Sequence, residues 1–237
     1  MLVDIFIPCV IDQFYPQTGW NFIKVLEKSG CSVNYNVEQT CCGQVAFNAG
    51  YWDDCKEIGS KFIKEFVFDR YIVSPSYSCV NMVKHHYSEM FFNTVLHNEY
   101  KQVQRNIYEV SNFLVNILKI TDLGAQLNAK GVFMNTCSST SECLKQTEAL
   151  ALLKNVKDLK LLSLDNPTQC CGFGGMFAVK NEPLSVKLGE EKINDALNVG
   201  AEVIISSDVS CLMHLDSIIK KKNLSLKTMH LVDVLSS

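Results

Sequence analysis

Eight of the eleven cysteines in this 237-residue chain recur at matched positions in its two halves. They are Cys9, Cys41, Cys42 and Cys79 in the first half and Cys137, Cys170, Cys171 and Cys211 in the second. The offsets are 128, 129 and 132 residues, and a glycine follows each adjacent pair. In a chain without a recognisable secretion signal, clustered cysteines indicate metal ligands or redox groups rather than disulfides. The spacing therefore predicts two thiolate sites, one in each half.

Four thiolates suit either an iron–sulfur cluster or Zn²⁺. Structural zinc sites usually use C-x₂₋₄-C hooks, and neither half contains one. The adjacent pairs and the long gaps favour an iron–sulfur cluster in each half, with zinc as the alternative. Gly43 and Gly172 would let the backbone bend so that both neighbouring sulfurs face one site, and their amides would donate to sulfur.

Alternating strands and helices would position these cysteines. In the first half we expect strands at 2–9, 31–37 and 70–76, and helices at 18–30, 47–68 and 78–91. In the second half we expect strands at 131–137, 159–164, 201–207 and 226–235, and helices at 141–156, 182–200 and 211–222. This order predicts an α/β fold with two tandem pseudo-symmetric modules, each with a mostly parallel sheet flanked by helices.

The expected division is a first module at 1–88, a mainly helical connector at 89–130 and a second module at 131–237. In each module the cysteines follow strands or precede helices. Loops at the carboxyl ends of parallel strands converge, so these sulfurs can meet although they are far apart in sequence.

Charge and hydropathy exclude several other classes of protein. The net charge of −3 gives no reason to expect a nucleic-acid partner. No apolar run approaches the roughly 18 to 20 residues that span a bilayer. The first residues lack a basic segment and include Asp4 and Pro8, so we expect a buried strand there and a cytoplasmic protein.

The cysteine pattern resembles the cysteine-rich CCG domain, which occurs twice in one of the subunits of heterodisulfide reductase. It also occurs in iron–sulfur subunits of glycolate oxidase and anaerobic glycerol-3-phosphate dehydrogenase. The strings TCCGQVAFNAGY, YIVSPSYSC, CCGFGGMFAVK, SCLMHL and MHLVDVL are similar to those of the lactate-utilisation protein A family over nearly the whole chain.

This resemblance implies an electron-transfer subunit of a bacterial complex that oxidises L-lactate to pyruvate. It implies one iron–sulfur cluster per half, of the [4Fe–4S] type, held by the eight cysteines. It also implies two partner subunits, one of them ferredoxin-like, and any association with a membrane would be through those partners. Abstraction of hydride or electrons from lactate would then take place on a partner.

The sequence departs from the fuller CCG pattern, because Ser76 and Asp208 occupy the place of a fifth cysteine in the two halves. Asp208 is expected to cap the helix before Cys211 or to donate an oxygen ligand, and Ser76 and Ser78 to be turn or cap residues. Two alternative functions stay open, a heterodisulfide reductase-like enzyme acting on a disulfide or thiol, and an assembly protein with structural zinc.

Other chemically active residues have simpler explanations. His85 and His86 are expected at the surface, and His214 is expected to pack or to hydrogen-bond near the second site. The glycines of GFGG at 172–175 match no phosphate-binding motif and would leave room for a cluster. The run at 220–222 would complement a helix C-terminus. The three remaining cysteines, expected to be small buried hydrophobic residues, are Cys31, Cys55 and Cys143.

Overall fold

Two four-stranded parallel sheets form the framework of the protein, in a computed structural model that describes residues 1–66, 68–136 and 147–237. The strand order is β2-β1-β3-β4 in the first sheet and β6-β5-β7-β8 in the second. Every neighbouring pair is parallel. The shared order confirms the predicted α/β fold of two tandem modules with helices flanking parallel sheets.

The elements of the first module follow one another along the chain in this order: β1 (Leu2–Ile5), α1 (Cys9–Phe14), α2 (Pro16–Lys28), β2 (Ser32–Tyr35), α3 (Gln44–Ala49), α4 (Trp52–Glu65), β3 (Ile72–Ser74), α5 (Tyr77–Asn81), the π-helical turn η1 (Met82–His86), α6 (Tyr87–Phe91), α7 (His97–Asn106), β4 (Ile107–Glu109), α8 (Val110–Asn112) and the π-helical turn η2 (Phe113–Ile117).

The described elements of the second module repeat the same alternation: β5 (Gln126–Phe133), α9 (Thr147–Leu153), β6 (Lys157–Leu162), α10 (Met176–Lys180), α11 (Glu182–Asn198), β7 (Val203–Ser206), α12 (Val209–Lys221), β8 (Lys227–His230) and α13 (Leu231–Leu235).

Three predicted elements are wrong in detail. The strand expected at 2–9 ends at Ile5, and Cys9 begins the helix α1. The helix expected at 47–68 is two helices, because α3 ends at Ala49, Gly50 follows it with a φ of +83°, and α4 begins at Trp52. The strand expected at 226–235 is a strand followed by a helix. The imidazole of His230 accepts a hydrogen bond from the Val232 amide at 3.2 Å and so caps α13.

The segment 89–130 contains α7, α8 and η2, and it also contributes β4 to the first sheet. Within the described parts of the chain, no helix has the length and apolar composition required to cross a bilayer.

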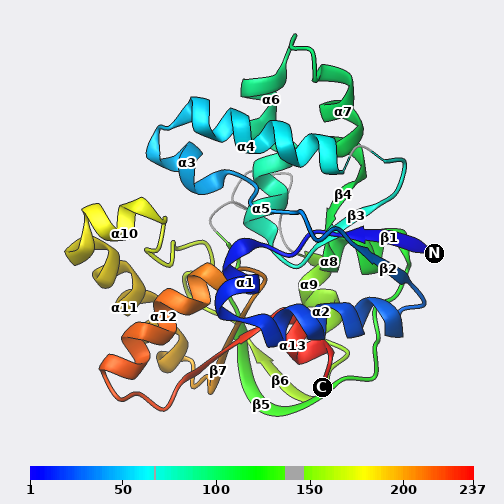
Figure 1. Ribbon diagram of the computed structural model, residues 1–237. Coiled ribbons are helices and arrows are strands. Elements are labelled where there is room, and N and C mark those ends of the chain that lie inside the picture. Colours follow the sequence, from blue (N-terminus) through cyan, green and yellow to red (C-terminus); the bar gives the residue numbers. More distant parts are fainter. Residues whose placement is uncertain (67, 137–146) are drawn as a thin grey trace.

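One hydrophobic core joins the two modules, and each module has a second core of its own. The shared core combines residues of β1 and α2, such as Val3 and Phe22, with Phe133 of β5 and Leu231 of α13. Asp233 of α13 also accepts hydrogen bonds from two side chains of α2. Figure 1 shows α2 and α13 side by side where the modules meet.

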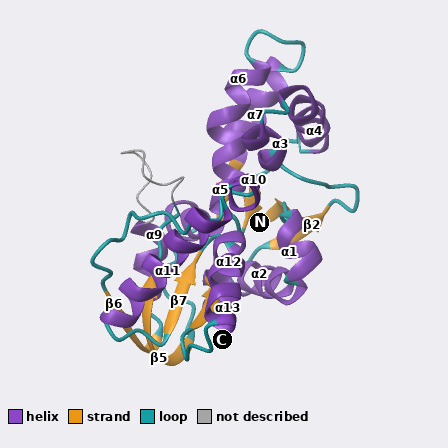
Figure 2. Cartoon of the chain, turned by 90° about the vertical axis from the view of Figure 1, so that its left-hand side faces the viewer, coloured by secondary structure: helices purple, strands orange, loops and turns teal. Residues whose placement is uncertain are grey.

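The outer cores lie on the other side of each sheet and contain cysteines of the predicted sites. Cys42 and Cys79 belong to the outer core of the first module, and Cys171 and Cys211 to that of the second. Figures 1 and 2 show α4, α6 and α7 at one end of the molecule and β5, β6 and β7 at the other. The cysteine-bearing loops of the two modules border one cavity between the modules.

Candidate metal or cluster site

Three loops at the carboxyl ends of the first sheet bring four cysteines together. Cys9 begins α1, Cys41 and Cys42 precede α3, and Cys79 lies in the first turn of α5. The sulfurs of Cys9 and Cys41 are 3.7 Å apart. The Cys42 thiol contacts both Cys41 and Cys79. The sulfurs therefore form a continuous chain of contacts, as expected for residues that meet at this edge of a parallel sheet.

The Cys41 sulfur is the acceptor at the centre of this chain. Hydrogen bonds from the thiols of Cys42 and Cys9, and then from the Gly43 and Cys42 amides, lower its pKa to about 3. The same contacts, together with burial, raise the pKa of the Cys9 and Cys42 thiols. The fold thus stabilises one thiolate among neighbouring thiols, which is the form that binds metals.

The second module repeats this arrangement in its described part. The sulfurs of Cys171 and Cys211 are 2.7 Å apart, and the Cys171 thiol also contacts Cys170. Contacts with Cys170 and then Cys211, followed by burial, raise the pKa of Cys171. The fourth cysteine expected at this site, Cys137, lies outside the described residues.

The glycine after each cysteine pair makes the same turn in both modules. Gly43 has a φ of +82° and Gly172 a φ of +87°. The Gly43 amide donates to the Cys41 sulfur and the Gly172 amide to the Cys170 sulfur, each at 3.3 Å. A Cβ on Gly172 would lie 2.3 Å from the Ser185 carbonyl oxygen, so only glycine fits without a shift of the backbone. This is the bend expected for two adjacent cysteines facing one site.

A single cavity of about 160 Å³ is lined by cysteines from both modules. They are Cys9, Cys41, Cys42, Cys79, Cys171 and Cys211. Phe173, Gly174 and Gly175 also line it, so the GFGG segment does border the site. The sequence predicts two sites, whereas the structure places both of them on one cavity between the modules.

Asp208 connects the two modules beside this cavity. One of its carboxylate oxygens accepts hydrogen bonds from the Ser76 hydroxyl at 2.8 Å, the Ser78 hydroxyl at 2.8 Å and the Ser78 amide at 3.0 Å. Burial raises the pKa of Asp208, and these hydrogen bonds partly oppose that shift.

The prediction that Asp208 caps the helix before Cys211 is therefore wrong. The residue stands at the N-cap position of α12, but its side chain makes no hydrogen bond to that helix. It binds the first turn of α5 in the other module instead. Ser76 does cap α5, as expected, because its hydroxyl accepts from the Cys79 amide at 3.3 Å.

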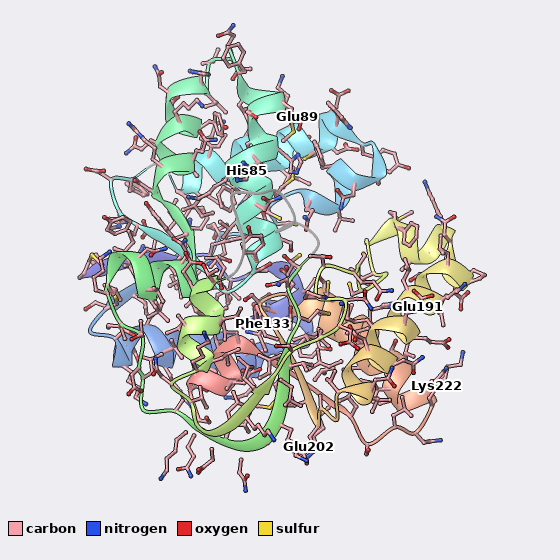
Figure 3. The ribbon with its side chains drawn as sticks, turned by 180° about the vertical axis from the view of Figure 1, so that it is seen from behind. His85, Glu89, Phe133, Glu191, Glu202 and Lys222 are labelled. Carbon is pink, nitrogen blue, oxygen red and sulfur yellow. The ribbon has the colours of Figure 1, made fainter. Side chains whose placement is uncertain are left out.

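Three histidines singled out in the sequence do not line the cavity that the cysteines share. His86 pairs with Glu89 at 3.1 Å. His85 lines a separate, smaller cavity. Figure 3 labels His85 and Glu89. His214 faces the Ser185 carbonyl oxygen at 3.2 Å. It therefore packs behind the loop that carries Gly172.

The charges at the end of α12 are paired along its surface. Lys220 forms an ion pair with Asp216 at 2.6 Å, and Lys222 forms one with Glu190 at 2.7 Å. Lys220 and Lys221 lie in the last turn of α12, which is the position expected for a lysine run that complements a helix C-terminus.

Sequence analysis missed the contacts of two residues with the site. Cys55 was expected only to be buried, and it is; a Cβ on Gly43 would lie 3.0 Å from its sulfur, so it packs directly behind the glycine of the first cysteine pair. The buried Tyr87 hydroxyl donates to the Cys42 carbonyl oxygen at 3.0 Å. Aligning α4 with α11 pairs Cys55 with Ser185 of the second module. This alignment could have pointed to the place of Cys55 behind the cysteine pair.

The donor set suits a centre bound by thiolates. No disulfide joins two cysteines of the described residues, and backbone amides point at the sulfurs of both pairs. Across 1–66, 68–136 and 147–237, no three His, Cys, Asp or Glu side chains are already spread around a point that would hold a metal ion. The thiols contact one another instead, so they would have to separate to hold a cluster with several metal ions.

Comparisons with known proteins agree with this architecture. A family model described as "CCG: Cysteine-rich domain" matches twice, at residues 3–84 and 132–216. A hypothetical protein from Helicobacter pylori, known from a crystal structure, superposes with a TM-score of 0.67 at 12% sequence identity. That match covers 99% of this chain and 48% of the other chain, and it supports the fold alone.

Curated relatives match over the full length. Lactate utilization protein A from Halalkalibacterium halodurans is 39% identical over 237 residues, covering 100% of this chain and 97% of the relative. Lactate utilization protein A from Geobacillus thermodenitrificans is 36% identical over 236 residues, covering 100% and 99%. The chain therefore belongs to the lactate utilization protein A family of cysteine-rich CCG-domain proteins.

Proposed function

We propose that this protein is an iron–sulfur electron-transfer subunit in the oxidation of L-lactate to pyruvate. The observation that carries the proposal is the cavity lined by cysteines of both modules. The choice of lactate as the substrate rests on relatives that are called lactate utilization protein A. In this proposal two further cytoplasmic subunits, one of them ferredoxin-like, complete the pathway, and lactate is oxidised on a partner.

The stoichiometry of the reaction fits two centres. Oxidation of L-lactate to pyruvate releases two electrons and two protons, and the protons leave at the partner that binds lactate. An iron–sulfur centre exchanges electrons singly, so two centres, of the [4Fe–4S] type in this proposal, would accept the pair. The chain's own contribution is to hold the thiolates, to donate amide hydrogen bonds to sulfur, and to place cysteines of both modules on one small cavity.

The proposal is tested by purifying the protein without oxygen and measuring iron, acid-labile sulfide and zinc. We expect a brown protein that contains iron and sulfide and bleaches with dithionite. Replacing Cys41 or Cys211 with alanine should remove the iron of one module. The matched control is Cys31→Ala, because Cys31 is buried in the shared core and does not line the cavity.

A colourless protein that binds zinc after reconstitution with iron and sulfide would overturn the iron–sulfur assignment. Deletion of the gene should abolish growth on L-lactate as the carbon source. Normal growth of the deletion strain would overturn the role in lactate oxidation.

Structural zinc is the second candidate, and the sulfur–sulfur distance in the first module favours it, whereas the 2.7 Å between the sulfurs of Cys171 and Cys211 does not fit it. A tetrahedral site with Zn–S bonds of about 2.3 Å places its sulfurs about 3.8 Å apart. The sulfurs of Cys9 and Cys41 are 3.7 Å apart. The same elemental analysis separates the two candidates.

Direct reduction of a disulfide substrate is less well supported. The positions that would hold a fifth cysteine are Ser76 and Asp208, and these two side chains hydrogen-bond to each other at 2.8 Å. The cavity of about 160 Å³ is also smaller than the roughly 300 to 1,000 Å³ of common ligand pockets.

A further inference from the structure

The second module contains a fully buried lysine close to its cysteine pair. Lys192 lies on α11 and has no exposed surface. Its ammonium group donates to the Asn166 carbonyl oxygen at 2.5 Å. That carbonyl also accepts from the Gln169 amide at 3.3 Å, in the turn that leads into Cys170. A buried lysine is rare in proteins because its charge loses hydration, so its position calls for an explanation.

Helix α11 presents Lys192 on the face that contacts the cysteine loop. Ser185, two turns earlier, donates its hydroxyl hydrogen to the Gly172 carbonyl oxygen at 2.7 Å. A Cβ on Gly189 would lie 3.4 Å from the Cys171 carbonyl oxygen. Residues three and four positions apart share one side of a helix, so Ser185, Gly189 and Lys192 form one row toward the cysteines. The residue just before Lys192, Glu191, is exposed (Figure 3).

Opposing effects act on the charge of Lys192. Burial lowers its pKa, whereas Asp195 and then the sulfurs of Cys171 and Cys170 raise it. Electrostatic interaction is mutual, so an ammonium that is stabilised by these sulfurs also stabilises negative charge on them. The carboxylate of Asp195 is itself bound by the amides of Asp165 and Asn166.

The first module has no such charge at the matching position. Aligning Gly59 of α4 with Gly189 of α11 pairs Phe62 with Lys192. Phe62 packs edge-on against Phe6, with ring centroids 4.9 Å apart. At matching positions beside similar cysteine loops, the first module therefore has an aromatic side chain and the second module has a buried cation.

A lysine on the neighbouring position of α4 supplies a control within the same molecule. Lys61 donates to the Glu38 carbonyl oxygen and pairs with Glu65, so it holds the loop after β2 much as Lys192 holds the loop after β6. Its side chain is 42% exposed. Holding this loop does not require burial of the ammonium group.

We propose that the buried ammonium group of Lys192 raises the reduction potential of the iron–sulfur centre in the second module above that of the first. This inference rests on the proposed function. Reduction adds one electron, and hence one negative charge, to a centre. A fixed positive charge in a poorly hydrated interior favours that addition. Lys192 acts on the centre through the field at Cys170 and Cys171, and its role is that of a positioning residue.

The test is a potentiometric titration of the reconstituted protein, followed by electron paramagnetic resonance. The centres are assigned with Cys41→Ala, which keeps only the second, and Cys211→Ala, which keeps only the first. We expect Lys192→Met to favour oxidation of the second centre at least tenfold, a fall of about 59 mV for a one-electron couple. Lys192→Arg should keep the potential, and Lys61→Met should change neither centre.

Three outcomes would overturn the inference while leaving the proposed function intact. In the first, both centres form but Lys192→Met leaves their potentials unchanged. In the second, Lys61→Met produces the same fall. In the third, the unmodified protein has equal potentials or the higher one in the first module; this measurement needs no lysine variant and decides the matter even if Lys192→Met does not fold. A protein that binds no iron would overturn the proposed function itself.

Discussion

Replacement of Gly172 by alanine should destabilise the protein more than any other glycine-to-alanine change with a similar backbone angle. The new Cβ would lie 2.3 Å from the Ser185 carbonyl oxygen and 3.0 Å from the Leu188 Cβ. The first contact involves backbone at the start of α11, which cannot rotate away. The φ of +87° adds a second cost, because side chains strain this left-handed region.

The magnitude follows from these two costs. The left-handed conformation costs about 1–2 kcal/mol for a residue with a Cβ. Forcing an extra carbon into a packed interior costs about 1–3 kcal/mol. The expected loss in the free energy of unfolding is therefore about 2–5 kcal/mol for Gly172→Ala.

Gly200 provides the matched control. It follows the C-terminal end of α11, whereas Gly172 packs against the N-terminal end of that helix. The φ of Gly200 is +78°, and a Cβ there would meet no atom within 4 Å. Gly200→Ala should cost only the conformational part, about 1–2 kcal/mol. The change in the unfolded chain is the same for both variants, so the difference between them isolates the clash.

The assay is urea unfolding of the cluster-free protein under reducing, anaerobic conditions, followed by circular dichroism. Equal slopes against urea concentration would show that the variants unfold from comparable states. If Gly172→Ala and Gly200→Ala lose the same free energy within 0.5 kcal/mol, roughly the error of such comparisons, the close approach of α11 to the cysteine loop is refuted.

Three other changes give independent tests. Burial raises the pKa of Glu109 to about 7, above the unfolded value near 4.5, so the native state keeps a proton that the unfolded chain releases. The free energy of unfolding should thus fall by about 3 kcal/mol as the pH rises between these values, and it should level off above them. Glu109→Gln should reduce this fall by that amount. If the free energy of unfolding, measured with urea, has the same pH dependence from pH 4 to 8 in both proteins, this prediction is contradicted. Asp208→Ala should lower the free energy of unfolding by about 2–4 kcal/mol, because the donors of Ser76 and Ser78 lose their acceptor. Replacement of the exposed Asp12 by alanine should change it by less than about 0.5 kcal/mol. Equal losses in the two variants would refute the bridge between the modules. Tyr87→Phe should cost about 1 kcal/mol in thermal or urea unfolding, and no loss would count against its hydrogen bond to the cysteine loop.

The sequence by itself determined the repeat, the alternation of strands and helices, and the set of cysteines that follow the strands. These features depend on local patterns, since the period of apolar residues and the order of elements do not require knowledge of distant contacts. Parallel strands place their loops at one edge, so the meeting of Cys9, Cys41, Cys42 and Cys79 follows from topology alone.

Elements with conflicting local signals were predicted less well. The apolar spacing continues across Gly50, so periodicity indicated one helix where the left-handed glycine separates two. The stretch after Leu226 is rich in residues that suit either state, and the capping contact of His230 decides that its second part is helical.

Only the tertiary structure decided how the two modules meet. Asp208 looks like a cap for its own helix in the sequence, but it binds α5 of the other module across 130 residues. Lys192 occurs in a charged helix, and its burial depends on which face α11 turns toward the cysteine loop. Sequence patterns encode contacts within a helix or strand, whereas a cavity shared by two modules depends on packing between surfaces that no local period describes.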